Sequence, residues 1–247
     1  MRYFIELSYN GKAYHGWQNQ PNAISVQEVI ENALSTLLSS SISIVGAGRT
    51  DAGVHAKQMF AHFDTDSEID EKQLAYKLNS FLPKDVAIHE IFGVKDDAHA
   101  RFDATSRAYI YELSTAKNPF TTETAYLVTL PLDVEAMNKA CEKLLGHKDF
   151  QCFSKSNTDV KTYYCTIESA VWSETDSGLK FEIKADRFLR NMVRAIVGTL
   201  LNIGLGKLTI DDLDTIIASK NRSEAGYSVP AHGLYLTEVK YPKSIRL

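Results

Sequence analysis

The residues whose types could do chemistry gather in one short segment, Gly46-Ala47-Gly48-Arg49-Thr50-Asp51-Ala52-Gly53-Val54-His55-Ala56. It holds one carboxylate, Asp51, and one guanidinium, Arg49, two residues apart. Its glycines let the backbone take positive φ and let another backbone or a ligand come close. A carboxylate fixed in such a frame can act as a nucleophile or stabilise developing positive charge. The alternative is a simple turn in which Asp51 caps its own backbone.

The segment lies between two stretches that are typical of strands with one buried face. The alternating run Ser41–Ile44 precedes it, and Lys57–Phe63 follows it. A loop held at both ends by strands can fix Asp51 better than a free surface loop could.

The common cofactor motifs are missing from the sequence. Asp51 stands where the dinucleotide-binding pattern needs a third glycine, and the Gly-Lys-Ser/Thr of a P-loop is absent. No HExxH, GxSxG or paired-cysteine spacing occurs, and no two histidines have ligand spacing on one helix face. We therefore expect no metal and no small-molecule cofactor.

Two other clusters combine charge with apolar or aromatic residues. Tyr109 and Tyr111 share one face of a predicted strand with Arg107, which fits either core packing or a platform for stacking a base. Arg194 interrupts an apolar helix, with Arg190 one turn earlier, so its guanidinium must reach solvent or meet a carboxylate.

The order of predicted elements is β-α-β-β-α-β in each half of the chain. The first half has strands at 2–9, 41–44, 57–63 and 86–92, with helices at 26–37 and 69–78. The second half has strands at 109–113, 167–172, 179–185 and 234–239, with helices at 133–145 and 189–203 and a shorter one from Asp211. This order predicts an α+β fold of two ferredoxin-like (split β-α-β) halves, 1–100 and 101–247, whose antiparallel sheets join around a central cleft.

The composition is that of an ordinary globular protein, with 44% hydrophobic and 23% charged residues and a net charge of −4. Residues 181–247 carry ten Lys/Arg against seven Asp/Glu, so a basic face is possible on an acidic protein. The three cysteines, Cys141, Cys152 and Cys165, form no CxxC pair and are typical of reduced cytosolic residues. With no signal peptide and no apolar run long enough for a membrane span, we expect a cytoplasmic protein without membrane association.

The stretch Gly48–Ala56 resembles the signature of the tRNA pseudouridine synthase A family. Other similar motifs follow in family order: Gly16-Trp17-Gln18-Asn19-Gln20, Arg107-x-Tyr109-x-Tyr111, Gly146-His147-x-Asp149-Phe150, Phe188-Leu189-x-x-Met192-Val193-Arg194-x-x-Val197-Gly198 and Gly233-Leu234-Tyr235-Leu236. One departure is Cys165, where the family often has an arginine.

This resemblance implies isomerisation of uridine to pseudouridine in the anticodon stem-loop of tRNA, at positions 38, 39 and 40, by a homodimer without cofactor. It implies Asp51 as the nucleophile, Arg194 as its ion-pair partner, and Tyr109, Arg49 and Leu236 as substrate-binding residues. The further RNA contacts that we expect are Arg107, Arg190 and His55.

On the sequence alone, two functions from other classes of protein stay open. A non-catalytic RNA-binding module would predict an RNP1-type string, which the sequence lacks. A nucleoside glycosidase would use Asp51 to stabilise a sugar cation and would release free uracil. The residues also leave open whether Asp51 attacks C1′, attacks C6 or removes the C2′ proton.

Overall fold

The computed structural model describes residues 1–156 and 160–247. The chain divides into two compact units, one of Met1–Ser106 with Tyr235–Leu247 and one of Arg107–Leu234. Both combine α-helices with mostly antiparallel strands, in agreement with the predicted α+β class. The predicted boundary near residue 100 lies close to the first division, but the C-terminal strand belongs to the first unit rather than to the second half.

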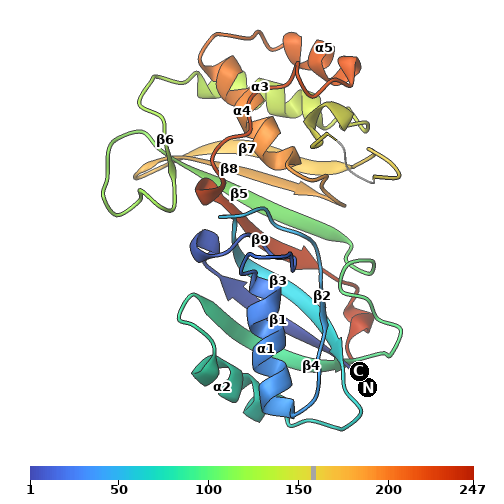
Figure 1. Ribbon diagram of the computed structural model, residues 1–247. Helices are drawn as coiled ribbons and strands as arrows, with labels where there is room; N and C mark the ends of the chain where they lie inside the picture. Colours follow the sequence, from blue (N-terminus) through green and yellow to red (C-terminus); the bar gives the residue numbers. More distant parts are fainter. Residues whose placement is uncertain (157–159) are drawn as a thin grey trace. The chain divides into compact units, whose positions relative to one another are not determined.

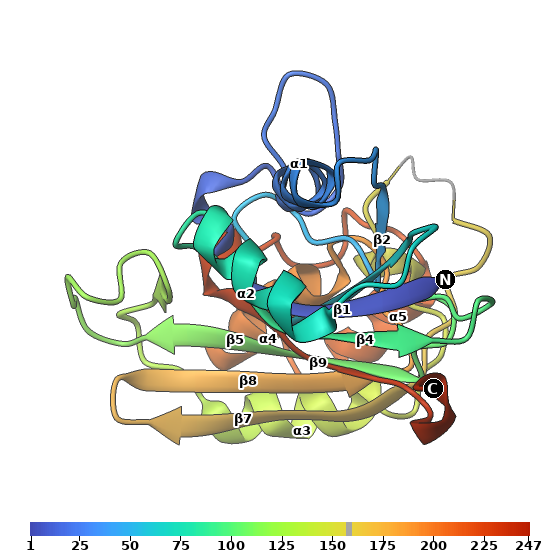
Figure 2. The same ribbon diagram turned by 90° about the horizontal axis from the view of Figure 1, so that it is seen from below.

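The first unit carries the predicted β-α-β-β-α-β order: β1 (Arg2–Tyr9), α1 (Val26–Leu38), β2 (Ile44–Gly46), β3 (His55–Asp64), α2 (Glu71–Phe81) and β4 (Val86–Val94). The strands are ordered β4-β1-β3-β2, and every one of these pairs is antiparallel. The last strand, β9 (Leu234–Lys240), runs parallel to β3 through the pairs His55↔Tyr235 and Ala56↔Leu236. Helices α1 and α2 lie on one face of this sheet (Figures 1 and 2).

The helix starts follow from their capping residues. The Ser25 hydroxyl accepts the Glu28 amide of α1 at 3.1 Å, as the capping motif predicts. The Asp70 carboxylate accepts the Gln73 amide at 2.9 Å, so α2 begins at Glu71 and not at the predicted residue 69.

Strand β2 begins later than its alternating sequence predicts. Ile42 and Ile44 are both buried, so the alternation does mark a core-facing side. However, the Ile42 amide donates to the Ser35 hydroxyl of α1 at 2.9 Å instead of to a neighbouring strand. The ladder with β3 therefore covers only Ile44–Gly46.

The second unit contains β5 (Ser106–Ser114), β6 (Tyr126–Leu127), α3 (Val134–Leu144), β7 (Ile167–Thr175), β8 (Gly178–Ala185), α4 (Met192–Gly204) and α5 (Asp212–Ser219). The unit begins at Arg107, so the first residue of β5, Ser106, belongs to the first unit. Strand β8 pairs antiparallel with β5 and β7, and β6 pairs parallel with the end of β5. Helices α3, α4 and α5 lie on one side of these strands (Figure 1). In the part of the chain that the structure describes, no helix is long and apolar enough to cross a membrane.

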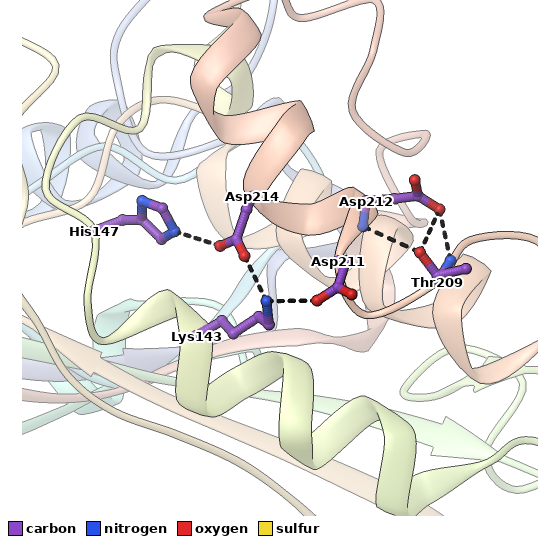
Figure 3. Close-up of polar contacts among 6 residues, drawn as sticks. All are labelled: Lys143, His147, Thr209, Asp211, Asp212 and Asp214. Carbon is purple, nitrogen blue, oxygen red and sulfur yellow. Dashed lines mark hydrogen bonds and ion pairs between the residues drawn. The ribbon is translucent and has the colours of Figure 1, made fainter.

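A charged cluster joins the end of α3 to the start of α5 (Figure 3). The Lys143 ammonium donates to the Asp211 and Asp214 carboxylates, at 2.9 Å from Asp211 Oδ1. The His147 Nε2 lies 2.8 Å from Asp214 Oδ1. Hydrogen bonds from Lys143 and then His147 lower the pKa of Asp214. The cluster fixes α5, from which the chain continues into the segment that packs on α4.

Candidate active site

The Asp51 loop, residues 47–54, joins β2 to β3 in the first unit. It is tied to the sheet where the Ala47 amide donates to the Phe60 carbonyl at 2.7 Å. Thr50 is buried, and its hydroxyl is hydrogen-bonded to the Tyr9 hydroxyl at 2.8 Å. Asp51 itself is half-buried, and its carbonyl accepts the Val54 amide at 3.1 Å. The backbone on both sides of the carboxylate is therefore held in place.

A second loop, from residue 10 to residue 20, packs directly on the Asp51 loop. The Trp17 amide donates to the Thr50 carbonyl at 3.2 Å, and the Gly53 amide donates to the Tyr14 carbonyl at 3.3 Å. Between them Gly16 has φ +93°, and a Cβ there would lie 2.5 Å from the Thr50 carbonyl oxygen. Only glycine allows both this backbone conformation and this close approach.

The Trp17 ring explains a second glycine. Trp17 is 1% exposed, and a Cβ on Gly46 would lie 2.5 Å from its ring atoms. The glycine that ends β2, just before the Asp51 loop, thus makes room for the indole. The Gly16-Trp17 motif, to which the sequence alone gives no structural role, supports the loop that carries the carboxylate.

His55 and Leu236 are placed at the other end of the loop. His55 is 2% exposed, its Nδ1 accepts the Gly11 amide at 3.1 Å, and its ring stacks on Tyr235 at 4.6 Å. Leu236 pairs with Ala56 and is 2% exposed. These contacts give both residues a structural role beside the loop.

Arg49 lies on the exposed side of the loop. Its Nε donates to the Gln18 side-chain oxygen at 3.1 Å, so the Gly16-Trp17-Gln18 motif also orients this arginine. Within the first unit, the structure thus brings together Asp51, Arg49 and the second loop.

In the second unit, Tyr109 and Tyr111 differ although they share one face of β5. Tyr111 is fully buried, and its hydroxyl donates to the Pro230 carbonyl at 2.8 Å, so it is a core residue. Tyr109 is half-buried, and the Phe188 ring meets it edge-on, with 5.2 Å between ring centroids. Arg107 donates from Nη1 to the Asp186 carbonyl at 2.9 Å.

Arg194 lies in the first turn of α4 and is half-buried. Its Nε donates to the Val229 carbonyl at 2.7 Å, which fixes the plane of the guanidinium. Arg190 is exposed and precedes the helix, because Asn191 has a left-handed conformation with φ 68° and α4 starts only at Met192. The pairing predicted between Arg194 and Asp51 would join residues of the two units and stays a prediction.

A family model described as tRNA pseudouridine synthase matches residues 7–103 and 140–242, which include the Asp51 loop and α4. The chain belongs to the tRNA pseudouridine synthase family. It is 55% identical over 245 residues to the tRNA pseudouridine synthase A of Parabacteroides distasonis, an alignment that covers 99% of this chain and 97% of that protein. The Bacteroides fragilis protein of the same name is 52% identical over 246 residues, covering 99% and 98%. That of Acetivibrio thermocellus is 42% identical over 237 residues, covering 95% and 97%. The family resemblance read from the motifs is confirmed.

Proposed function

We propose that this chain isomerises uridine to pseudouridine in the anticodon stem-loop of tRNA, at positions 38, 39 and 40, with Asp51 as the catalytic carboxylate. Membership of the family makes the chain an isomerase that acts on uridine in tRNA. The observation that carries the role of Asp51 is its place on a loop anchored to the sheet, to Tyr9 and to the Gly16-Trp17 backbone.

The reaction breaks the N1–C1′ bond, turns the uracil while it is held, and joins C5 to C1′. The proton on C5 is released and N1 gains one, so the product is an isomer of the substrate. Cleavage of a glycosidic bond develops positive charge on the sugar, which an ionised carboxylate can stabilise or trap covalently. We assign Asp51 as the nucleophile, with attack at C1′ or C6; proton removal at C2′ is the third route open to the same carboxylate.

Arg194 is the proposed partner of Asp51. A guanidinium beside the carboxylate would donate charge-assisted hydrogen bonds to it and hold it in one orientation. The hydrogen bond from Arg194 Nε to the Val229 carbonyl supports this role, because it restrains the orientation of the guanidinium. An apolar helix that carries an arginine in its first turn then has a functional reason for it.

Substrate binding requires that the target base leave its stem. Extrusion of a stacked base costs a few kcal/mol, which contacts to the flipped nucleotide must supply. Tyr109 is proposed to pack on the uracil, and the edge-on contact with Phe188 keeps its ring in place. Arg49 is proposed to fill the vacated space or hold a phosphate, and its exposure and its bond to Gln18 suit both. Leu236, which pairs with Ala56 at the end of the loop, is the third proposed substrate-binding residue.

The remaining expectations come from the order of the predicted elements, from the composition and from the family resemblance. The antiparallel order β4-β1-β3-β2 supports a ferredoxin-like assignment for the first unit. A second half of the same kind, a central cleft, a homodimer and a cytoplasmic location stay predictions. So do the RNA contacts of Arg107, Arg190 and His55.

One chromatogram tests this function against its alternatives. The protein is incubated with tRNA that has uridine at positions 38, 39 and 40, and the tRNA is then digested to nucleosides. We expect pseudouridine and no free uracil, and no pseudouridine when these uridines are replaced by cytidine. Free uracil would establish a glycosidase instead, and binding without conversion would establish a non-catalytic RNA-binding module.

A further inference from the structure

The segment from Arg222 to Pro230 packs its backbone directly on α4 in the second unit. A Cβ on Gly226 would lie 2.5 Å from the Gly198 carbonyl carbon and the Thr199 nitrogen of the helix. The Gly226 amide donates to the Thr199 hydroxyl at 2.8 Å, and both residues are buried. With no side chain between the two backbones, a small shift of the segment is transmitted to its contacts with the helix.

Arg222 holds this segment in its folded form. Its Nη1 donates to the carbonyls of Ala225 at 3.4 Å and Gly226 at 3.0 Å, and its Nη2 donates to the Ser228 hydroxyl at 2.9 Å. The Ser228 hydroxyl also accepts the Asn191 side-chain amide at 2.7 Å, just before α4. Burial lowers the pKa of the Arg222 guanidinium. A half-buried charge that is directed at backbone carbonyls and a hydroxyl organises a loop at a desolvation cost.

The end of the same segment meets Arg194. The Val229 amide donates to the Arg194 carbonyl at 3.3 Å, and the Arg194 Nε donates back to the Val229 carbonyl at 2.7 Å. Val229 is fully buried, so its carbonyl has no freedom to follow a misplaced side chain. The direction of the Arg194 guanidinium therefore depends on where residues 225–229 are held.

We propose that Arg222 is a positioning residue for the reaction, which acts by locking residues 225–229 and so orienting the Arg194 guanidinium toward the carboxylate of Asp51. This role rests on the proposed function, in which Arg194 is the partner of Asp51. In this proposal Arg222 acts through Arg194 and not by contacts of its own with the substrate. Its contribution is the geometry of a second arginine.

The test compares Arg222→Met with Arg222→Lys in single-turnover assays, with enzyme in excess over tRNA and well above the Kd. We expect Arg222→Met to lower the rate by about tenfold to a hundredfold, as for a small misplacement of a catalytic group, while the Kd for tRNA stays within about twofold. Arg222→Lys should restore part of the rate, because one ammonium can reach some of the three acceptors. Lys207→Met, which removes a charge from the α4–α5 connection without touching the segment, should match the wild type.

A double-mutant cycle separates positioning from general stabilisation. Arg194→Lys keeps the charge but lacks the Nε donor to Val229. In this background Arg222→Met should therefore lower the single-turnover rate by less than about a further twofold. Fully additive losses, or a wild-type rate in folded Arg222→Met, would overturn the proposal. If Arg222→Met does not fold, Ser228→Ala, which removes one acceptor, replaces it in the same cycle. Absence of turnover in the wild type would refute the proposed function itself, a result distinct from an additive cycle.

Discussion

The substitution Gly16→Ala should displace the Asp51 loop, and its cost can be worked from the structure. Gly16 has φ +93°, where an L-residue costs about 1–2 kcal/mol. The added Cβ would also lie 2.5 Å from the Thr50 carbonyl oxygen and 3.2 Å from the Ala52 nitrogen. Relief of such a contact by a backbone shift costs about 1–3 kcal/mol more. We therefore expect the free energy of unfolding to fall by roughly 3 kcal/mol.

Activity should suffer more than stability, because the atoms that must move flank the carboxylate. A displacement of about 1 Å at a catalytic group can cost about a hundredfold in rate. Urea denaturation gives the loss of stability. Single-turnover pseudouridine formation, with enzyme in excess over tRNA and at a temperature where the variant is folded, gives the loss of rate.

Gly48→Ala is the matched control for stability in the same loop. A Cβ on Gly48 would meet no atom within 4 Å, so its free energy of unfolding should stay within about 0.5 kcal/mol of the wild type. Equal stabilities of the two variants, or a wild-type rate for Gly16→Ala, would refute the argument that Gly16 sets the position of the loop.

Three further predictions concern charge and stacking. Burial, followed by the nearby Arg2, lowers the pKa of His62 to about 4, so its unfolded form, with a pKa near 6.5, binds more protons between these values. The free energy of unfolding should fall by up to about 3 kcal/mol as the pH drops from 6.5 to 4. In denaturation curves, His62→Asn, whose amide oxygen can accept the Ala100 amide, should flatten this dependence on pH. An unchanged slope in His62→Asn would show that His62 is not the titrating group. Tyr109→Leu should weaken tRNA binding by about 1–3 kcal/mol, whereas Tyr109→Phe should bind tRNA like the wild type. Equal Kd values for Tyr109→Leu and the wild type would rule out stacking of a base on Tyr109. Arg194→Met should lower the single-turnover rate and alter its pH profile; if both are unchanged, the proposed ion pair is wrong.

Local structure followed closely from periodicity and capping. The apolar stripe that starts after Ser25 predicted α1 almost to the residue, and the first six elements occur in the predicted order. Two differences arise where a group outside the predicted element takes a backbone partner. The Ile42 amide bonds to the Ser35 hydroxyl, and β9 pairs with β3 across most of the chain length. Neither partner is visible in a local pattern.

The candidate site, too, could be predicted only in part. The residue types and motifs singled out Asp51, Arg49 and Arg194, because charges in glycine-rich or apolar surroundings need a reason. The strand pattern alone could not distinguish Tyr109 from Tyr111, since both occupy one face of a strand, and only the family resemblance pointed to Tyr109. Only the folded structure brings the Tyr111 hydroxyl to the Pro230 carbonyl and leaves Tyr109 half-buried.

Asp51→Asn is the decisive test of the proposal that Asp51 carries the chemistry. The amide has nearly the same size as the carboxylate, and the Asp51 loop is held by backbone bonds and by Thr50, so the variant should fold and bind tRNA. The measurement is tritium release from 5-tritiated uridine in tRNA, with enzyme in excess over substrate. For Asp51→Asn we expect a wild-type Kd for tRNA and no tritium release above background. Full release by Asp51→Asn would contradict the proposal.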